Sequence, residues 1–308
     1  MLWPWAYPLL FRIQPKTSSM KRPLVVLLVG MAGTGKSTVA HRLHLYCIEQ
    51  KKRAYFINLD PAAFGETAFA CNIDIRDTID YKQVMHQYKL GPNGAIMTAL
   101  NLYATKFHQV ISILEQKEDL EFIFVDTPGQ IEVFTWSASG QLITEAFSST
   151  FPTCIMFVGD TARCTNPQTF MSTMLYSSSI LYKSQVPLLL CLNKCDIVSG
   201  DTILSWIRDT DTLSEALREA KGYGATLTAS LALFIHEFYE NIPVACASAL
   251  TGDGFSQLCE VCLPKSKQEY LDTYLPHIER RAAKLREAEE KTMATQRSKL
   301  SRDLSSDV

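Results

Sequence analysis

Gly30-Met31-Ala32-Gly33-Thr34-Gly35-Lys36-Ser37 fits the phosphate-binding pattern G-x4-G-K-[ST]. The apolar, β-branched run 24–29 before it predicts a buried strand, and residues 38–51 after it lack Gly and Pro and carry apolar residues at helical spacing. A strand, a glycine loop and a helix in this order are the context that the pattern requires, because the backbone N–H groups then surround a phosphate at a helix N-terminus. Lys36 is suited to the β- and γ-phosphates and Ser37 to Mg2+. The stretch therefore predicts a nucleotide site in an α/β fold.

A second pattern indicates which base is bound. Asn193-Lys194-Cys195-Asp196 follows the apolar run 187–192 and fits N-K-x-D, the guanine-reading motif of GTPases. The Asp196 carboxylate can accept hydrogen bonds from guanine N1–H and the 2-amino group, whereas adenine would leave the carboxylate unpaired. Ser248-Ala249, after the apolar run 243–247, fits the short S-A element that completes a guanine pocket. The nucleotide is therefore expected to be GTP or GDP.

The residues for hydrolysis are expected after the apolar run 122–125, in Asp126-Thr127-Pro128-Gly129-Gln130. A carboxylate at the end of a strand beside the P-loop strand is the usual holder of Mg2+, so Ser37 and Asp126 are the expected metal residues. Gly129 allows a backbone N–H to approach the γ-phosphate, and the Gln130 amide can orient the attacking water. The alternative is an ordinary D-T-P-G turn after a strand.

Asp60 is a further candidate, because Asp60-Pro61 ends the apolar run 55–59. A helical stretch near 78–90 lies between this run and the run 122–125, so the two strands are expected to pair in parallel through a crossover. Parallel strands bring their C-terminal ends to one edge, which would place Asp60 beside Asp126 as a general base or water-positioning group. The alternative is a helix-capping or turn residue.

Gly91-Pro92-Asn93-Gly94 indicates an ordinary turn by composition alone. Together with the motifs above, however, it resembles the signature of the GPN-loop GTPases. The runs 91–102 and 129–140 are similar to the first of the three eukaryotic paralogues, and the run 72–77 also resembles that family. The resemblance covers about residues 24–254.

The resemblance implies a mostly parallel sheet flanked by helices, with helical insertions, in a GTPase activated by dimerisation. Asn93 would then act in the site of a partner subunit, while Gln130 and Asp60 act within their own chain. The resemblance also implies GTP/GDP and Mg2+ as ligands, and a homodimer or a heterodimer with a paralogue. It further implies a role in assembling RNA polymerase II and delivering it from the cytoplasm to the nucleus.

The catalytic candidates are thus Gln130, Asn93 and Asp60. The residues expected to bind the nucleotide are Gly30, Met31, Ala32, Gly33, Thr34, Gly35, Lys36, Ser37, Thr38, Asp126, Gly129, Asn193, Lys194, Asp196, Ser248 and Ala249. Two rival functions stay open. One is a GTP-dependent binding scaffold with negligible hydrolysis, which Gln130 disfavours. The other is a P-loop kinase for a small molecule, which N-K-x-D and D-T-P-G-Q together disfavour.

Composition limits the partners. The chain has 308 residues, is 47% hydrophobic and carries a formal net charge of −2, so it offers no basic field for direct nucleic-acid binding. No apolar run reaches the roughly 18 residues that span a bilayer, so no membrane partner is expected. The nine cysteines, several within apolar runs, favour reduced thiols over a disulfide framework. Cys259 and Cys262 have no second pair or nearby His, which disfavours a zinc or redox site.

Composition also divides the chain into three parts. Residues 1–20 are expected to be a disordered leader, with Met20 as a possible natural start. Residues 21–264 are expected to form the GTPase domain, and residues 265–308 a charged helix and a Ser-rich disordered tail. Within the domain, the apolar run 232–239 predicts a helix, either as cover for the nucleotide edge or as a groove for a client.

Overall fold

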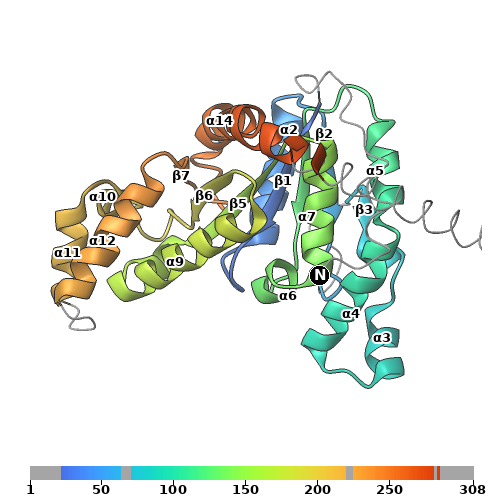
Figure 1. The fold of residues 1–308 in the computed structure, drawn as a ribbon, viewed down its shortest axis with the longest axis horizontal. Coiled ribbons are helices and arrows are strands. Elements are labelled where there is room, and N and C mark those ends of the chain that lie inside the picture. Colours follow the sequence, from blue (N-terminus) through green and yellow to red (C-terminus); the bar gives the residue numbers. More distant parts are fainter. Residues whose placement is uncertain (1–21, 64–70, 220–224, 281–282, 285–308) are drawn as a thin grey trace, which may run out of the picture.

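A seven-stranded sheet organises the computed structural model, which describes residues 22–63, 71–219, 225–280 and 283–284 (Figure 1). The strand order is β3-β2-β4-β1-β5-β6-β7, and all six pairs are parallel. The strands are β1 (Leu24–Val29), β2 (Ala54–Asn58), β3 (Ile73–Asp74), β4 (Phe122–Asp126), β5 (Thr153–Asp160), β6 (Leu188–Asn193) and β7 (Val244–Cys246). The expected α/β P-loop fold is therefore confirmed, and the sheet is parallel throughout.

The central strands β1, β5 and β6 are buried along their whole length, which explains why their sequences are continuous apolar runs rather than alternating ones. β1 lies between β4 and β5, with Leu28 opposite Asp126 and Val29 opposite Phe157. β2 and β4 pair in parallel, as the crossover argument predicts, so the strand ends at Asn58 and Asp126 share the edge that carries the P-loop.

Helices cover both faces of the sheet. The side chains of Val25 and Leu27 belong to one apolar core, which the helices between β3 and β7 complete, whereas Leu24, Val26 and Leu28 belong to the other core with α2 and the C-terminal helices. The first face carries α3 (Tyr81–Tyr88), α4 (Pro92–Thr105), α5 (Phe107–Glu115), α6 (Ile131–Thr135), α7 (Ala138–Thr150), α8 (Thr161–Cys164), α9 (Pro167–Ser184), α10 (Asp201–Arg208), α11 (Thr210–Glu219) and α12 (Ala225–Tyr239). The second face carries α2 (Lys36–Glu49), α13 (Phe255–Gln257), the π-helix η3 (Leu258–Cys262) and α14 (Leu263–Glu269). A second π-helix, η4 (Tyr270–Tyr274), continues from α14.

Two features differ from the sequence expectation. Gly91 to Gly94 is not an isolated turn, because α4 begins at Pro92, a residue that fits the first turn of a helix. Packed residues also continue past the boundary expected at 264: Ser266 and Tyr270 are buried, and the Tyr270 hydroxyl bonds the Ser148 carbonyl. The expected leader (residues 1–20) and the Ser-rich end of the tail lie outside the described residues.

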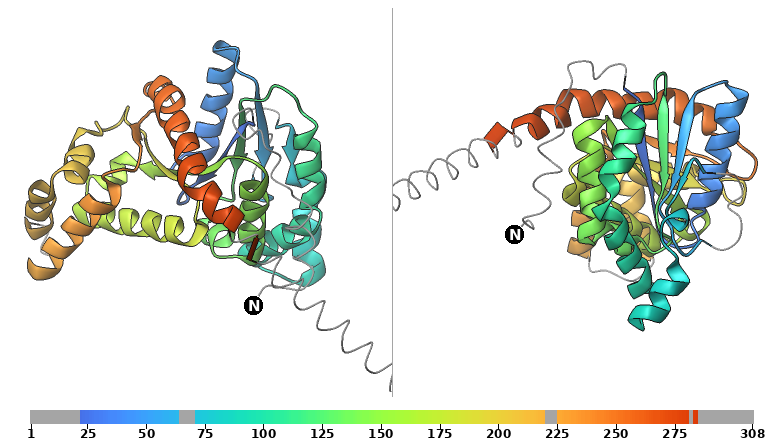
Figure 2. Two further views of the ribbon diagram at one scale, coloured as in Figure 1. Left: turned by 45° about the horizontal axis from the view of Figure 1, so that its top comes forward. Right: turned by 90° about the vertical axis from the view of Figure 1, so that its right-hand side faces the viewer.

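The α3–α4 pair forms a hairpin that projects beyond the sheet, with residues 89–91 at its tip (Figures 1 and 2). Asp80 caps α3 by accepting hydrogen bonds from the N–H groups of Lys82 and Gln83. The helix expected near 232–239 is the second half of α12, which packs on α9 and α11. Among the helices of the described ranges, none combines the length and the apolar character needed to cross a membrane.

Candidate functional site

The P-loop adopts a backbone that only glycine accommodates at three positions. Gly33 and Gly35 have left-handed φ values of +80° and +90°. A Cβ on Gly30 would lie 2.5 Å from the Val158 carbonyl oxygen, and a Cβ on Gly35 would lie 2.6 Å from Asn193 Nδ2. The loop is therefore held tightly between β5 and the end of β6.

Lys36 lies inside this loop, with 6% of the residue exposed. Its Nζ donates to the Gly30 carbonyl at 2.7 Å and more weakly to the Gly129 carbonyl at 3.4 Å. Burial lowers the pKa of the ammonium group, while the charges of Asp126 and Asp60 act in the opposite direction. The lysine thus bonds loop carbonyls at the position where the sequence predicts phosphate.

Asp126 ends β4, next to the first turn of α2. Burial raises the pKa of its carboxyl to about 6. A hydrogen bond from Ser37 favours the charged form and therefore lowers the pKa, but by less than burial raises it. Its Oδ1 is buried and has no hydrogen-bond partner among the residues that the structure describes. Thr127 fixes the following loop, because its hydroxyl donates to the Leu28 carbonyl at 2.7 Å. Ser37, which bonds this carboxylate, and the next residue Thr38 are exposed.

Asp60 lies at the same edge and contacts two backbone amides. Its Oδ1 accepts from the N–H of Ala62 at 2.9 Å, which is the turn role, and its Oδ2 accepts from the N–H of Gly129 at 3.2 Å. Burial raises the pKa of this carboxyl, and the two amide hydrogen bonds oppose that shift. Each carboxylate oxygen therefore serves a different function in the structure, one in the local turn and the other against the loop that precedes Gln130.

The two amide candidates lie in different places. Gln130 directly precedes α6 and is half-buried at the strand edge. Asn93 is exposed in the first turn of α4, near the tip of the hairpin that projects beyond the sheet (Figure 2). The Pro92 carbonyl beside it accepts from the Tyr81 hydroxyl at 3.3 Å, which ties the two helices of the hairpin.

The residues of the two guanine motifs meet at the P-loop. Asn193 donates through Nδ2 to the Thr34 carbonyl at 2.9 Å and accepts through Oδ1 from the N–H of Ala249 at 3.0 Å. Asp196 Oδ1 accepts from the Ser248 hydroxyl at 2.5 Å. The loops after β6 and β7 are therefore joined to each other and to the phosphate-binding loop by side-chain hydrogen bonds.

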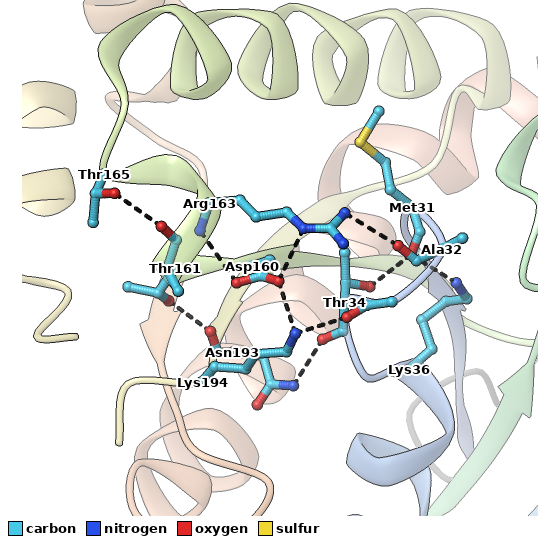
Figure 3. Close-up of polar contacts among 12 residues, drawn as sticks. Met31, Ala32, Thr34, Lys36, Asp160, Thr161, Arg163, Thr165, Asn193 and Lys194 are labelled. Carbon is cyan, nitrogen blue, oxygen red and sulfur yellow. Dashed lines mark hydrogen bonds and ion pairs between the residues drawn. The ribbon is translucent and has the colours of Figure 1, made fainter. Parts of the chain in front are cut away.

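Lys194 contacts the P-loop and a carboxylate that the sequence analysis missed (Figure 3). Its Nζ lies 2.7 Å from the Gly33 carbonyl oxygen and 2.7 Å from Asp160 Oδ2. Asp160 ends β5 and also pairs with Arg163 Nε at 3.5 Å, and Arg163 donates to the Ala32 carbonyl at 3.4 Å. A charged cluster therefore borders the outer side of the loop.

The signal for Asp160 is present in the chain, because Gly159-Asp160-Thr161 follows the apolar run 154–158 as the other motifs follow theirs. Arg42 was also missed. It lies on α2 and donates to the Ala249 carbonyl at 3.1 Å, so it fixes the S-A loop from the other side. The sequence does not distinguish an arginine of an amphipathic helix that bonds a distant loop from one that only faces solvent.

Comparison with known proteins assigns the family. A family model described as "Conserved hypothetical ATP binding protein" matches residues 28–266. The chain is 49% identical over 259 residues to the GPN-loop GTPase QQT2 of Arabidopsis thaliana, covering 83% of this chain and 67% of that protein. It is 42% identical over 298 residues to GPN-loop GTPase 1 of Schizosaccharomyces pombe, covering 94% and 81%.

The chain belongs to the GPN-loop GTPase family. GPN-loop GTPase 1 of Saccharomyces cerevisiae is 44% identical to this GPN-loop GTPase, with 86% of this chain and 71% of the relative covered. A solved structure titled as a GTPase in apo form from Pyrococcus abyssi matches at a TM-score of 0.67 and 23% identity, over 81% of this chain and 98% of that one, which supports the fold. The family-model description mentions ATP, whereas these relatives are named GTPases, in agreement with the guanine motif at Asn193 to Asp196.

Proposed function

We propose that this GPN-loop GTPase binds GTP with Mg2+ at the P-loop edge of the sheet and hydrolyses it as a dimer, as a switch in RNA polymerase II assembly. The observation that carries the proposal is the convergence of Lys36, Asp126 and Asp60 with the guanine loops around the P-loop, at one edge of the sheet. Phosphate binding, metal binding and base recognition each need groups at this edge, and the chain supplies them from the ends of adjacent parallel strands.

Mg2+ fits the residues next to the P-loop. Asp126 Oδ1 is a buried carboxylate oxygen with no hydrogen-bond partner in the described part of the chain, and the Ser37 hydroxyl bonds the same carboxylate. Mg2+ prefers oxygen ligands and takes few of them from the protein. Ser37 and Asp126 would hold it, and the bound ion would supply charge stabilisation to the phosphates.

Guanine recognition is assigned to Asp196, positioned by Ser248 and by the Asn193 bonds to both neighbouring loops. The Ser248 hydroxyl donates to one carboxylate oxygen, which orients the group and leaves acceptor capacity on both oxygens for the two guanine donors. An adenine base offers no donor at those positions. GTP is therefore the proposed substrate.

Asp60 and Gln130 are proposed to arrange the attacking water. In the structure the Asp60 carboxylate accepts the Gly129 N–H, the amide expected to bind the γ-phosphate. A γ-phosphate would compete for that N–H and release one Asp60 oxygen toward the water. Burial already raises the pKa of the Asp60 carboxyl, which strengthens it as a proton acceptor once it is released.

Asn93 is proposed to act on a partner's nucleotide. Its exposure near the tip of a projecting hairpin suits contact with a second subunit (Figure 2). An amide can hold water or a phosphate oxygen without adding charge. The partner is proposed to be a paralogous GPN-loop GTPase or a second copy of this chain.

The cellular role is proposed from what the sequence resemblance implies, and the relatives named GPN-loop GTPase 1 support only the family. By that resemblance the protein would bind RNA polymerase II subunits in the cytoplasm and shuttle to the nucleus. The test is recovery of those subunits with the tagged protein in the GTP state and the GDP state. Equal recovery in both states and with Lys36→Ala would reject a nucleotide-controlled role.

The enzymatic proposal is tested by phosphate release from GTP and from ATP, with Mg2+ or with a chelator. Release from GTP alone, lost with the chelator and in Asp126→Asn, is the expected result. Tight GTP binding with no release by the dimer would instead support the scaffold without hydrolysis.

A further inference from the structure

Three consecutive carbonyl groups of the P-loop are bonded from outside by side chains of neighbouring strand ends (Figure 3). The carbonyls of residues 32–34 accept, in chain order, from Arg163 at 3.4 Å, Lys194 at 2.7 Å and Asn193 at 2.9 Å. The C=O and N–H of one peptide unit point in opposite directions. Bonds to the carbonyls on the outer side therefore turn the N–H groups of residues 33–35 toward the inner side. In this structure the Thr34 N–H donates to the Met31 carbonyl at 3.3 Å, a bond that a phosphate would replace.

Two of the three donors depend on one carboxylate. Asp160 is 5% exposed and accepts from Lys194 Nζ at 2.7 Å through Oδ2, which also lies 3.5 Å from Arg163 Nε. A buried carboxylate without a cationic partner would be costly, so the pairing fixes where the cations lie. The Arg163 side chain is 61% exposed and its contacts are longer, so the Lys194 pair is the stronger of the two.

We propose that Asp160 is a positioning residue for nucleotide binding, which holds Lys194 and Arg163 against the outer carbonyls of the P-loop. It acts through these two cations and through the loop, at the opposite side from the phosphate-binding amides. The inference rests on the proposed nucleotide site and adds a residue that neither the P-loop nor the guanine motif contains. Without Asp160, Lys194 would lose its anchor and the loop amides would lose part of their fixed orientation.

Asp160 also has a local structural role that the test must separate. Its Oδ1 accepts from the N–H of Arg163 at 3.3 Å and so caps α8. Asn is as good an N-cap as Asp, so Asp160→Asn keeps the cap and removes the charge. Asp209→Asn is the matched control, because Asp209 is exposed, accepts from the N–H of Asp211 at 3.0 Å and lies between α10 and α11.

The measurement is the dissociation rate of a fluorescent GDP analogue from the full chain in the presence of Mg2+. Asp160→Asn is expected to release GDP about tenfold faster, the loss of one charge-assisted hydrogen bond, with the melting temperature of the nucleotide-free protein unchanged. Asp209→Asn is expected to match the wild type. Arg163→Gln changes an exposed side chain and is expected to accelerate release by a smaller factor.

The double variant Asp160→Asn/Arg163→Gln is expected to release GDP no faster than Asp160→Asn alone. The reason is that Asp160 holds Arg163 against the P-loop, so Asp160→Asn already removes the effect of Arg163. Wild-type release by Asp160→Asn would overturn the inference and reduce Asp160 to a helix cap. If Asp160→Asn fails to fold, wild-type release by Arg163→Gln has the same consequence. Failure of the wild type to bind GDP would instead overturn the proposed function itself.

Discussion

The buried Lys36 and the half-buried Asp60 and Asp126 form one charged group at the sheet edge. Burial lowers the pKa of the Lys36 ammonium and raises the pKa of both carboxyls, while the attraction between the lysine and the two carboxylates acts against these shifts. Such a group is costly in the nucleotide-free protein. Bound phosphates would pair with the lysine, and a divalent cation would pair with the carboxylates. Nucleotide binding is therefore expected to stabilise the folded protein through these three residues.

Asp126 gives this coupling a defined pH dependence. Burial raises the pKa of its carboxyl from 3.8 to about 6, so ionisation destabilises the folded, nucleotide-free protein at pH values above about 6 and costs nothing below about 4. Asp126→Asn should therefore stabilise that state at pH 7.5, by up to about 3 kcal/mol, and much less at pH 4. Denaturant unfolding of both proteins at the two pH values measures this. Equal stability at pH 7.5 would contradict the account.

Asp196 makes a prediction about base selectivity. In Asp196→Asn the carboxylate proposed to accept both guanine donors becomes an amide, which can instead donate to the 2-oxo group of xanthine. The GDP dissociation constant should rise by about a hundredfold or more, and the xanthosine diphosphate constant should fall. Competition binding with both nucleotides measures the change. Unchanged GDP binding in this variant would remove Asp196 from the site.

At the scale of elements, the corner between α6 and α7 depends on a glycine. Among the glycines of the described residues, Gly140 leaves the least room for a Cβ. A Cβ on Gly140 would lie 1.9 Å from the Phe134 carbonyl oxygen, and the Gly140 N–H donates to Ser137 Oγ at 3.0 Å. The helix α6, which begins directly after Gln130, ends at this corner, so the corner fixes the C-terminal end of that helix.

Gly140→Ala should therefore destabilise the protein by about 3 kcal/mol or more, because backbone must move to make room. Gly94→Ala is the matched change in α4, where the new Cβ would meet only the Leu90 side chain, at an ordinary 3.5 Å. That variant should keep or raise stability by up to about 1 kcal/mol. Urea unfolding compares the two. Equal effects would contradict the packing account.

Element prediction succeeded where a strand is buried on both faces. The runs at 24–29, 122–125 and 187–192 predict strands because a central parallel strand must be apolar throughout. The two-residue strand β3 has no such signal, since its residues are only half-buried. The glycine and proline at residues 91–92 indicate a turn by composition, yet proline also suits the start of a helix, and α4 begins there.

Sequence alone could name candidate site residues that lie within fixed spacings, but not those whose partners come from elsewhere in the chain. The P-loop and N-K-x-D are contiguous, so their residues can be named from sequence. Asp160 and Arg42 contact the P-loop or the S-A loop across large sequence separations, and only the fold brings them there. The placement of Asn93 in a partner's site stays a prediction, because it depends on a second chain.

At the scale of the whole molecule, the C-terminal helices complete one face of the sheet. Tyr270 is buried, and its hydroxyl donates to the Ser148 carbonyl near the end of α7. The two residues are 122 positions apart in the sequence. Lys267 donates to the Arg22 carbonyl at 2.7 Å, just before β1. Residues 263–274 thus fasten the edge of the domain rather than follow it as a loose extension.

Tyr270→Ala should consequently destabilise the domain by about 3 to 5 kcal/mol, and Tyr270→Phe by about 1 to 2 kcal/mol, because the second keeps the ring and loses the hydroxyl. Tyr182→Ala is the control, since Tyr182 is 87% exposed on α9. It should change stability by less than about 0.5 kcal/mol. Thermal unfolding checks all three, and a neutral Tyr270→Ala would show that these helices do not support the sheet.

The dimer-dependent mechanism is the central claim, and GTP turnover by Asn93→Ala tests it most directly. Wild type, alone and with its nearest paralogue, is compared with Asn93→Ala over a range of protein concentrations, with GTP binding measured in parallel. We predict that wild-type turnover per molecule rises with concentration, and that Asn93→Ala binds GTP normally but turns it over at least tenfold more slowly. Wild-type turnover by Asn93→Ala, at every concentration, would contradict the account.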